Sequence, residues 1–321
     1  KMRFKHIIPN TLTFLIIGCD GSYESNKDEM VTELKTYDKD TSDNATSSCP
    51  SSGCMFVAVG NSGTILTSSD GISWTSRTSG TSKDLKGISY GNNIFLAAND
   101  IVLSSSDGQS WNTTREDPVH SFNQVFYANS IFTLVGNEIR TTSDGSSLTL
   151  RHSDTSKPLN GITYGNSTFV AVGNSGTILT SSDGTSWTSR TSGTSHHLQG
   201  VIYGNTIFVA VGLTGKIYTS SDGISWTSRT SCCPLTSTDF FGVTFGNSIF
   251  VAVGDGWIIT SSDGISWTRG YPGAFREVTY GDSTFVVVGN SGVIITSSDG
   301  ISWTWRTSGT SHHLRGVTYS K

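Results

Sequence analysis

Charged side chains are scarce in this chain. Lys, Arg, Asp and Glu make up 14% of its 321 residues, and the formal net charge is −4. From Cys54 onward, 15 basic residues stand against 17 acidic ones, and no cluster of Lys or Arg forms a basic stripe. Because nucleic-acid binding depends on such a stripe, the composition argues against a nucleic-acid partner.

Long apolar runs are missing as well. The run from Ile7 to Gly18 contains a proline and an asparagine and is too short to span a bilayer as a stable helix. It follows the basic stub Lys1–Lys5, as in a secretory signal. At Leu15–Cys19 the segment resembles a bacterial lipoprotein signal, which implies a signal peptide over residues 1–18 and lipid on Cys19. The alternative is an ordinary signal peptide with an incidental cysteine.

Residues 19–53 are predicted to be a tether that begins at the lipidated cysteine. From residue 20 they carry eight acidic and three basic side chains, many Ser, Thr and Asn, and few apolar groups. Such a composition cannot bury enough apolar surface to fold, so we expect disorder. Anchor and tether together predict a bacterial cell-envelope protein, lipid-anchored and either periplasmic or surface-exposed. The sequence does not choose between these membranes.

Cysteine is rare, with five residues in the chain. If Cys19 carries lipid, four remain, and an even number permits two bridges in an oxidising compartment. Cys49 and Cys54 are close in sequence and are the predicted pair. Cys232 and Cys233 are adjacent, and the sequence leaves open whether they are free thiols or a strained bridge.

What the chain has in abundance is repetition. A Ser/Thr-x-Asp-Gly phrase occurs seven times, usually followed by Ser-Trp, at intervals of 36 to 41 residues. A period of this length, filled with short alternating strands, is typical of a β-propeller blade. The repeated aspartates are Asp70, Asp107, Asp144, Asp183, Asp222, Asp263 and Asp299.

Each unit is predicted to contain four antiparallel strands, with the Asp-Gly turn between the third and the fourth. The first unit lacks its own first strand, and Gly316–Tyr319 supplies the matching phrase at the other end of the chain. The sequence therefore predicts an all-β, seven-bladed propeller over residues 54–321. The C-terminal strand would close the ring by joining the first blade.

At Ser68–Trp74 the chain resembles the Asp-box (BNR) repeat family, which includes sialidases, sortilin-type receptors and photosystem II assembly factor propellers. The resemblance covers all seven units, although the turn here is one residue shorter than the usual Asp-box. In the family these turns lie away from the substrate-binding face. The resemblance therefore implies that the seven aspartates are structural, as do the hydrogen bonds that a short Asp side chain can accept from its own turn.

Candidate ligand-binding residues lie in the loops on the face opposite the Asp-Gly turns. Trp257 replaces a polar turn residue, so its indole would either stack on a sugar or peptide or pack on a neighbouring blade. The two histidine pairs invite a metal site, but no cysteine or carboxylate cluster accompanies them, so we predict no metal and no cofactor. The candidates are Asn61, Lys83, Asn174, His196, His197, Lys216, Trp257, Asn290, His312 and His313.

Two functions from different classes remain. The first is a monomeric, non-catalytic binding or scaffolding module for an unidentified protein or glycan, held at the membrane by its N-terminal lipid. The second is a sialidase-like glycoside hydrolase, which needs an arginine cluster, a Tyr/Glu nucleophile pair and an acidic residue. Glu occurs after residue 54 only at Glu116, Glu138 and Glu277, and the Arg-Ile-Pro phrase of sialidases is absent. The sequence therefore favours the binding module.

Overall fold

The computed structural model describes residue 50 and residues 53–116, 121–229 and 238–320. The predictions for the signal peptide, for Cys19 and for the tether up to residue 49 lie outside this part of the chain. Cys49, Cys232 and Cys233 lie outside it as well. Within the described residues, no helix is long and apolar enough to cross a membrane.

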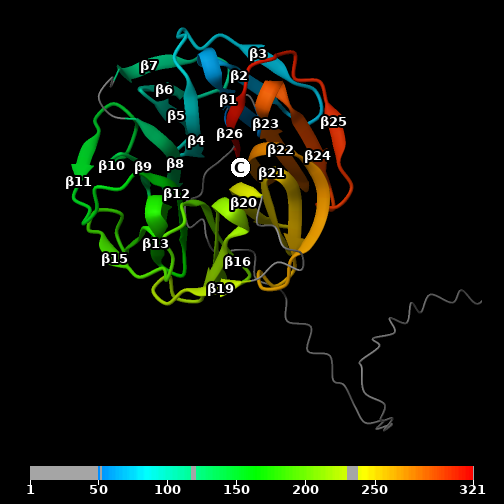
Figure 1. Cartoon of the computed structure of the whole chain (residues 1–321). Coiled ribbons are helices and arrows are strands. Elements are labelled where there is room, and N and C mark those ends of the chain that lie inside the picture. Colours follow the sequence, from blue (N-terminus) through cyan, green and yellow to red (C-terminus); the bar gives the residue numbers. More distant parts are fainter. Residues whose placement is uncertain (1–49, 51–52, 117–120, 230–237, 321) are drawn as a thin grey trace, which may run out of the picture. The chain divides into compact units, whose positions relative to one another are not determined.

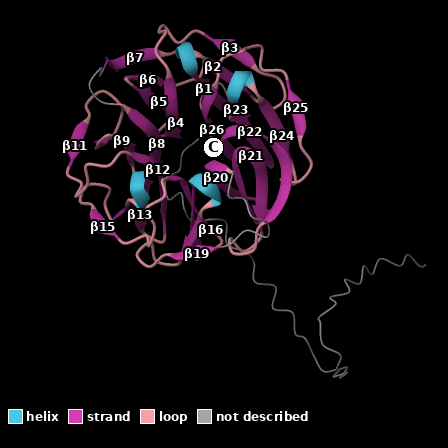
Figure 2. Ribbon diagram, viewed as in Figure 1, coloured by secondary structure: helices cyan, strands magenta, loops and turns pink. Residues whose placement is uncertain are grey.

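The described secondary structure is β-sheet with four short 3-10 helices (Figure 2). Runs of Val, Ile, Thr and aromatic residues form the strands, as expected for a half-buried pleated surface. Tight turns of two residues with positive φ join the first and second strands of a unit, as at Asn166 (45°) and Ser167 (58°). This conformation matches the twist of an antiparallel hairpin.

Five of the sheets contain four antiparallel strands. The first sheet has the order β26 (Leu314–Tyr319), β1 (Phe56–Gly60), β2 (Ile65–Ser68) and β3 (Thr75–Arg77). The second has β4 (Leu85–Gly91), β5 (Ile94–Asn99), β6 (Ile101–Ser105) and β7 (Asn112–Glu116). The third has β8 (Phe122–Ala128), β9 (Ile131–Gly136), β10 (Ile139–Thr142) and β11 (Thr149–Arg151). The fourth has β12 (Leu159–Gly165), β13 (Thr168–Gly173), β14 (Ile178–Ser181) and β15 (Thr188–Arg190). The fifth has β16 (Leu198–Gly204), β17 (Ile207–Gly212), β18 (Ile217–Ser220) and β19 (Thr227–Arg229).

The last sheet has six strands in sequence order. They are β20 (Asp239–Gly246), β21 (Ile249–Ser261), β22 (Thr268–Gly281), β23 (Thr284–Gly289), β24 (Ile294–Ser297) and β25 (Thr304–Arg306). Four 3-10 helices join the second and third strands of four repeats, the last of them within the six-stranded sheet: η1 (Asn61–Gly63), η2 (Asn174–Gly176), η3 (Leu213–Gly215) and η4 (Asn290–Gly292).

The prediction of seven separate blades is wrong, because the described chain forms six sheets. The sixth and seventh repeats share one sheet through the long strands β21 and β22. Residues 255–257 of β21 stay extended and pair with residues 272–274 of β22. In most other units a 3-10 helix separates the second strand from the third, and a polar loop separates the fourth strand from the first strand of the next unit. Both breaks are missing here, so the two repeats are continuous.

The two ends of the described chain meet in the first sheet. Strand β26 pairs antiparallel with β1, from Phe56 opposite Tyr319 to Gly60 opposite Leu314. The backbone N–H of Met55 also donates to the hydroxyl of Ser320 at 2.9 Å. Figure 1 shows β26 beside β1, with β4, β8, β12, β20 and β22 also near the common centre. Strands β3, β7, β11, β15, β19 and β25 lie at the rim (Figure 1).

Buried apolar side chains fill the spaces between the sheets. One cluster joins Val57 of the first sheet to Phe95 of the second, and another joins Leu96 of the second to Phe132 of the third. In the six-stranded sheet, Val251 of β21 and Phe285 of β23 belong to one cluster, so the two halves of this sheet pack on each other. The core is therefore divided among neighbouring faces, and each sheet depends on its neighbours.

Candidate binding surface

The sheets have two ends of different character. We name the end that carries η1–η4 and the connections between sheets the loop face. The opposite end, which carries the seven repeated aspartates, is the Asp-Gly face. Strand direction alternates within an antiparallel sheet, so turns between second and third strands lie at the opposite end from turns between third and fourth strands.

On the Asp-Gly face, the aspartates bind their own turns. Asp299 Oδ1 accepts hydrogen bonds from the backbone N–H groups of Ile301 and Ser302, both at 2.8 Å. These backbone hydrogen bonds, with that of Ser302 first, lower the pKa of Asp299 to about 2. Asp70, Asp107, Asp183, Asp222 and Asp263 accept the same pair of backbone hydrogen bonds.

In five of these turns the indole N–H of the tryptophan donates to the backbone oxygen of the turn glycine, whereas the buried indole N–H of Trp303 has no hydrogen-bond partner among the described residues. In the first turn the indole N–H of Trp74 donates to the backbone oxygen of Gly71 at 3.0 Å. In the third turn Leu148 replaces tryptophan, and Asp144 accepts the backbone N–H and the hydroxyl of Ser146. The carboxylates of the Asp-Gly face thus accept hydrogen bonds from their own turns.

On the loop face, three of the candidate asparagines orient residues of the innermost strands. Asn61 Oδ1 accepts from Arg315 Nε at 3.0 Å, and Asn290 Oδ1 accepts from Arg276 Nε at 3.0 Å. Asn174 Oδ1 accepts from the side-chain amide of Asn160 at 2.9 Å. In each case the turn and the innermost strand belong to the same sheet, so these asparagines support a neighbouring side chain.

The histidine candidates lie in loop contacts between sheets. His313 Nδ1 accepts the backbone N–H of Ser291 at 3.0 Å, the same contact that the carboxylate of Asp84 makes with Ser62. His312 Nδ1 lies 2.8 Å from the hydroxyl of Thr64. Two further candidates also contact loop residues: Thr194 Oγ1 accepts the backbone N–H of His196, and the backbone oxygen of His197 accepts that of Leu213. No group of three or more His, Cys, Asp and Glu side chains that could hold a metal occurs in the described part of the chain.

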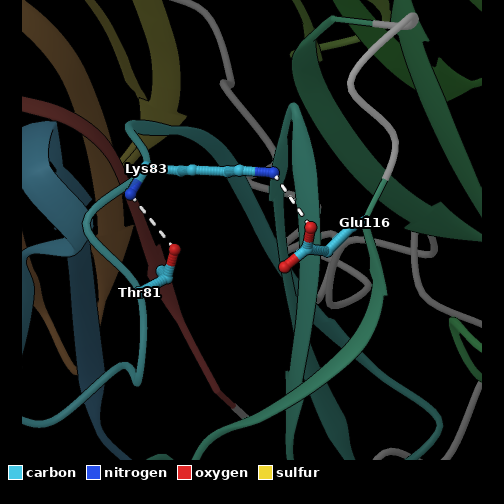
Figure 3. A network of polar contacts seen from close by, with 3 residues as sticks. All are labelled: Thr81, Lys83 and Glu116. Carbon is cyan, nitrogen blue, oxygen red and sulfur yellow. Dashed lines mark hydrogen bonds and ion pairs between the residues drawn. The ribbon is translucent and has the colours of Figure 1, made fainter.

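The two lysine candidates lie apart from each other. Lys83 extends from its loop toward β7, and its Nζ lies 3.4 Å from Glu116 Oε2, as Figure 3 shows. Its backbone N–H donates to Thr81 Oγ1 at 3.1 Å (Figure 3). Lys216 follows η3, and its backbone N–H donates to Leu213 O at 3.4 Å. The described contacts do not bring these lysines into one cluster with the histidines.

Trp257 packs against its neighbours rather than standing free. It is partly buried on the cluster formed by Phe250 and Trp267. The guanidinium of Arg269 lies over its ring, 4.3 Å from the centroid. Trp257 therefore packs largely on the protein, and Arg269 covers one face of its indole.

A ring of residues that sequence reasoning missed surrounds the centre of the loop face. Each follows the first buried Leu or Phe of an innermost strand, and all are half-buried: Lys86, Asn123, Asn160, Gln199, Phe241, Arg276 and Arg315. We call this set the inner ring. Its three cationic members lie on β22, β26 and β4, which are consecutive neighbours in space. They form a basic arc in a molecule whose composition shows no basic stripe.

Hydrogen bonds connect the members of the inner ring. Lys86 Nζ donates to Asn123 Oδ1 at 3.3 Å, and the amide of Asn123 donates to Asn160 Oδ1 at 3.3 Å. Arg276 is held at the other end of the arc, with its guanidinium 4.3 Å above the ring of Phe241 and 3.4 Å from Asp255 Oδ2. The side chains of the basic arc are thereby positioned before any ligand binds.

Arg315 is the partly desolvated member of the arc. Burial lowers the pKa of Arg315, and the positive charge of Arg276 lowers it further, while Asp84 acts in the opposite direction. The two guanidiniums are therefore close enough to repel each other. An anionic group placed between them would relieve this repulsion.

Glu277 follows Arg276 in the sequence, and its carboxyl group carries little charge at neutral pH. Its side chain is half-buried, and the resulting loss of hydration raises the pKa of the carboxyl to about 8. Glu277 Oε1 accepts the backbone N–H of Val278 at 3.0 Å.

Cys54 is the one cysteine among the described residues, and it is disulfide-bonded. Its partner therefore lies outside them. The pairing with Cys49 stays a prediction.

No protein-family model and no curated protein matches the sequence. The fold is similar to that of solved propellers. A structure of YCF48 bound to a D1 peptide superposes with a TM-score of 0.61 at 20% identity, covering 79% of this chain and 89% of that one. YCF48 from Cyanidioschyzon merolae gives 0.60 at 17% identity over 75% and 91%. Virginiamycin B lyase from Staphylococcus aureus gives 0.59 at 12% identity over 69% and 83%. At these identities the likeness shows a β-propeller fold, shared by binding proteins and by an enzyme.

Proposed function

We propose that this chain is a non-catalytic binding module, anchored to a bacterial membrane through lipid on Cys19, whose propeller binds an acidic segment of a partner protein. The binding site is the basic arc of Lys86, Arg276 and Arg315 on the loop face. The observation that carries the proposal is the position of three cationic side chains on three adjacent innermost strands. Two of them are oriented by asparagines of η1 and η4.

The chemistry of the arc favours a carboxylate ligand. Guanidinium groups form paired hydrogen bonds with carboxylates, and their strength increases in a partly desolvated site. Each arginine uses its Nε to bind an asparagine, and Nη2 of Arg276 lies 3.4 Å from Asp255 Oδ2, so an incoming carboxylate would share that guanidinium with Asp255. The aromatic ring of Phe241 beside Arg276 adds an apolar contact for a peptide side chain.

The similarity in fold to YCF48 supports a protein ligand, since that protein was solved with a D1 peptide bound. Virginiamycin B lyase has a similar fold and is an enzyme, so fold alone does not decide against catalysis. The non-catalytic assignment instead rests on the three glutamates. Glu116 pairs with Lys83, Glu138 with Arg140, and the half-buried Glu277 with a backbone N–H.

The sialidase-like alternative has its own test. Purified protein would hydrolyse a fluorogenic sialoside, and Glu277→Gln would abolish the activity. Hydrolysis with this dependence would replace the binding module by an enzyme.

The binding proposal is tested with an array of short acidic peptides, each beside its amide counterpart with Gln and Asn. The wild type should bind the acidic peptides. The double variant Arg276→Gln/Arg315→Gln should bind them at least about tenfold more weakly, because it lacks two charges that complement the peptide carboxylates. Raising the salt concentration should weaken the wild type more than the variant. Lys157→Gln removes an exposed charge outside the basic arc, in the connection between β11 and β12, and should bind as the wild type does.

Equal binding by the double variant and the wild type would reject the basic arc as the site. Binding that ignores the acidic residues of the peptides would reject the proposed ligand chemistry.

The anchor is tested separately in cells. Cys19→Ala should prevent incorporation of labelled fatty acid and move the protein from the membrane fraction to the soluble fraction, because the acyl chains supply the membrane affinity. Unchanged labelling would reject lipidation at this residue without bearing on the basic arc.

A further inference from the structure

Trp305 is the most exposed aromatic side chain in the described part of the chain, at 58%. It lies in β25, an outer edge strand, where the corresponding residues of β3, β15 and β19 are the serines Ser76, Ser189 and Ser228. Its indole N–H donates to the hydroxyl of Tyr271 at 2.8 Å, which fixes the orientation of the ring. Tyr271 comes from β22, in the segment that replaces a loop of the other units.

The indole forms one wall of a surface groove of about 450 Å³. Its lining also includes Ser291 and Val293 from the connection between β23 and β24, and Thr307, Ser308 and Ser311 from the loop after β25. The single charged group is Arg306, whose Nε donates to Thr296 Oγ1 at 2.8 Å. The lining thus combines one flat apolar face with many hydroxyl and backbone groups and no carboxylate.

We propose that this groove is a saccharide-binding subsite. A pyranose ring has an apolar face of C–H groups and an edge of hydroxyls, and the groove offers an aromatic plane with hydroxyls around it. The ring stacks on Trp305, and its hydroxyls exchange hydrogen bonds with Ser291, Thr307 and Ser311. The absence of carboxylates in the lining and the engagement of Arg306 favour a neutral sugar.

The same chain contains a natural comparison for this site. A second groove of about 430 Å³ in the first sheet is lined by the equivalent residues Ser62, Thr64, Arg77 and Thr78, with Ser76 in place of Trp305. It has the hydroxyls and the arginine but no tryptophan. His312 also lines it, and it shares Gly309 and Thr310 with the first groove. The proposal predicts that this twin groove does not bind saccharide by itself.

The test uses the purified full chain and four neutral probes: the hexasaccharides of glucose (maltose-type), xylose, mannose and N-acetylglucosamine. Each is titrated to about 10 mM, and binding is followed by tryptophan fluorescence and by calorimetry. We expect at least one probe to bind and to change the tryptophan signal. Trp305→Ser, which copies the twin groove, should weaken this binding at least about tenfold, as loss of a central aromatic contact does.

Two more variants separate stacking from folding. Trp305→Phe keeps an aromatic plane and should retain binding within about threefold. Ser76→Trp should add tryptophan-dependent binding at the twin groove, read in the Trp305→Ser background. Since Trp305 is exposed, the melting temperature of each variant should stay within about 2 °C of the wild type.

The proposal is overturned if none of the four probes binds, or if Trp305→Ser binds as tightly as the wild type. It is also overturned if Trp305→Ser loses peptide binding on the array while saccharide binding is unchanged, since the groove would then belong to a peptide. Neither result depends on Arg276 or Arg315, so this test and that of the basic arc fail independently.

Discussion

Glu277 and Gln124 are equivalent residues with different ionisation behaviour. Both side chains accept the backbone N–H of the following residue, at 3.0 Å from Val278 and 3.1 Å from Val125. Burial raises the pKa of the Glu277 carboxyl to about 8, whereas the amide does not titrate. The folded state therefore prefers the protonated acid, and an amide satisfies the same geometry in β8.

Glu277→Gln should remove a pH-dependent loss of stability. The folded pKa lies above the unfolded value of about 4.3, so the wild type loses stability as pH rises from about 4 to about 8. We expect equal free energies of unfolding near pH 4 and a gain of at least about 1 kcal/mol for the variant at pH 8. Urea denaturation across this range measures it, and Gln124→Glu should create the same dependence in β8. Parallel pH profiles of wild type and Glu277→Gln would contradict the assignment.

Asp299 should affect the pH dependence of stability in acid, with the opposite sign to Glu277. Its lowered pKa means that its contribution is present above the unfolded value of about 3.9 and is lost as pH falls toward 2. Asp299→Asn keeps an acceptor oxygen but removes the charge, so we expect a flatter decline of melting temperature between pH 4 and pH 2. Asp100→Asn, outside the seven turns, is the control. A variant with the full wild-type decline would show that the turn carboxylate does not titrate as described.

At the residue scale, the sequence predicted turn chemistry better than binding chemistry. Asp-Gly followed by Ser-Trp carries its own local contacts, so the pattern is sufficient. The cationic members of the inner ring stand where the other units have Asn, Gln or Phe, and their grouping depends on which strands are neighbours in space. A comparison of the residue after the first Leu or Phe of every unit would have found Lys86, Arg276 and Arg315. Trp305 was not predicted as a binding residue, because its local sequence does not show that the side chain is exposed on an outer strand.

At the scale of elements, strands and hairpins follow from the repeat, but the fused sheet does not. Gly254–Trp257 replaces the usual turn phrase, and the repeat pattern alone still predicts a turn there. Whether this segment turns or stays extended depends on residues 272–274, which supply the pairing partner. Such a pairing between two irregular segments has no periodic signal, so the sequence predicted seven separate blades where six sheets exist.

Close contacts between neighbouring innermost strands give a prediction for glycine. Gly165 ends β12 against the aromatic ring of Tyr203 in β16, and a Cβ at this position would overlap the ring. We expect Gly165→Ala to destabilise the protein by about 2 to 3 kcal/mol, the usual cost of overpacking a core. Thermal or urea unfolding measures the change.

Gly193→Ala is the matched control for this substitution. Gly193 has φ of +73° with open space around its Cβ direction, so the alanine meets backbone strain of about 1 kcal/mol without a clash. Similar losses in the two variants would mean that the overlap with Tyr203 costs no more than backbone strain does.

At the scale of the whole molecule, the first sheet depends on β26. Removal of Gly316–Lys321 would leave one edge of β1 unpaired and uncover the cluster that contains Phe56 and Val317. Because every sheet packs on its neighbours, we expect the entire propeller to lose stability, with a fall in melting temperature well above about 5 °C. Differential scanning calorimetry checks this. An unchanged melting temperature would show that the pairing contributes little.

The pairing of β26 with β1 also has a consequence for biosynthesis. Met55 and Ser320, which are hydrogen-bonded to each other, are separated by 265 positions in the chain. During synthesis at roughly 5–20 residues per second, β1 therefore waits many seconds with an exposed edge before its partner leaves the ribosome. An unpaired strand edge is a site for misassembly and for chaperone binding. Pairing with β26 thus ends the exposure of this edge of β1 in the nascent propeller.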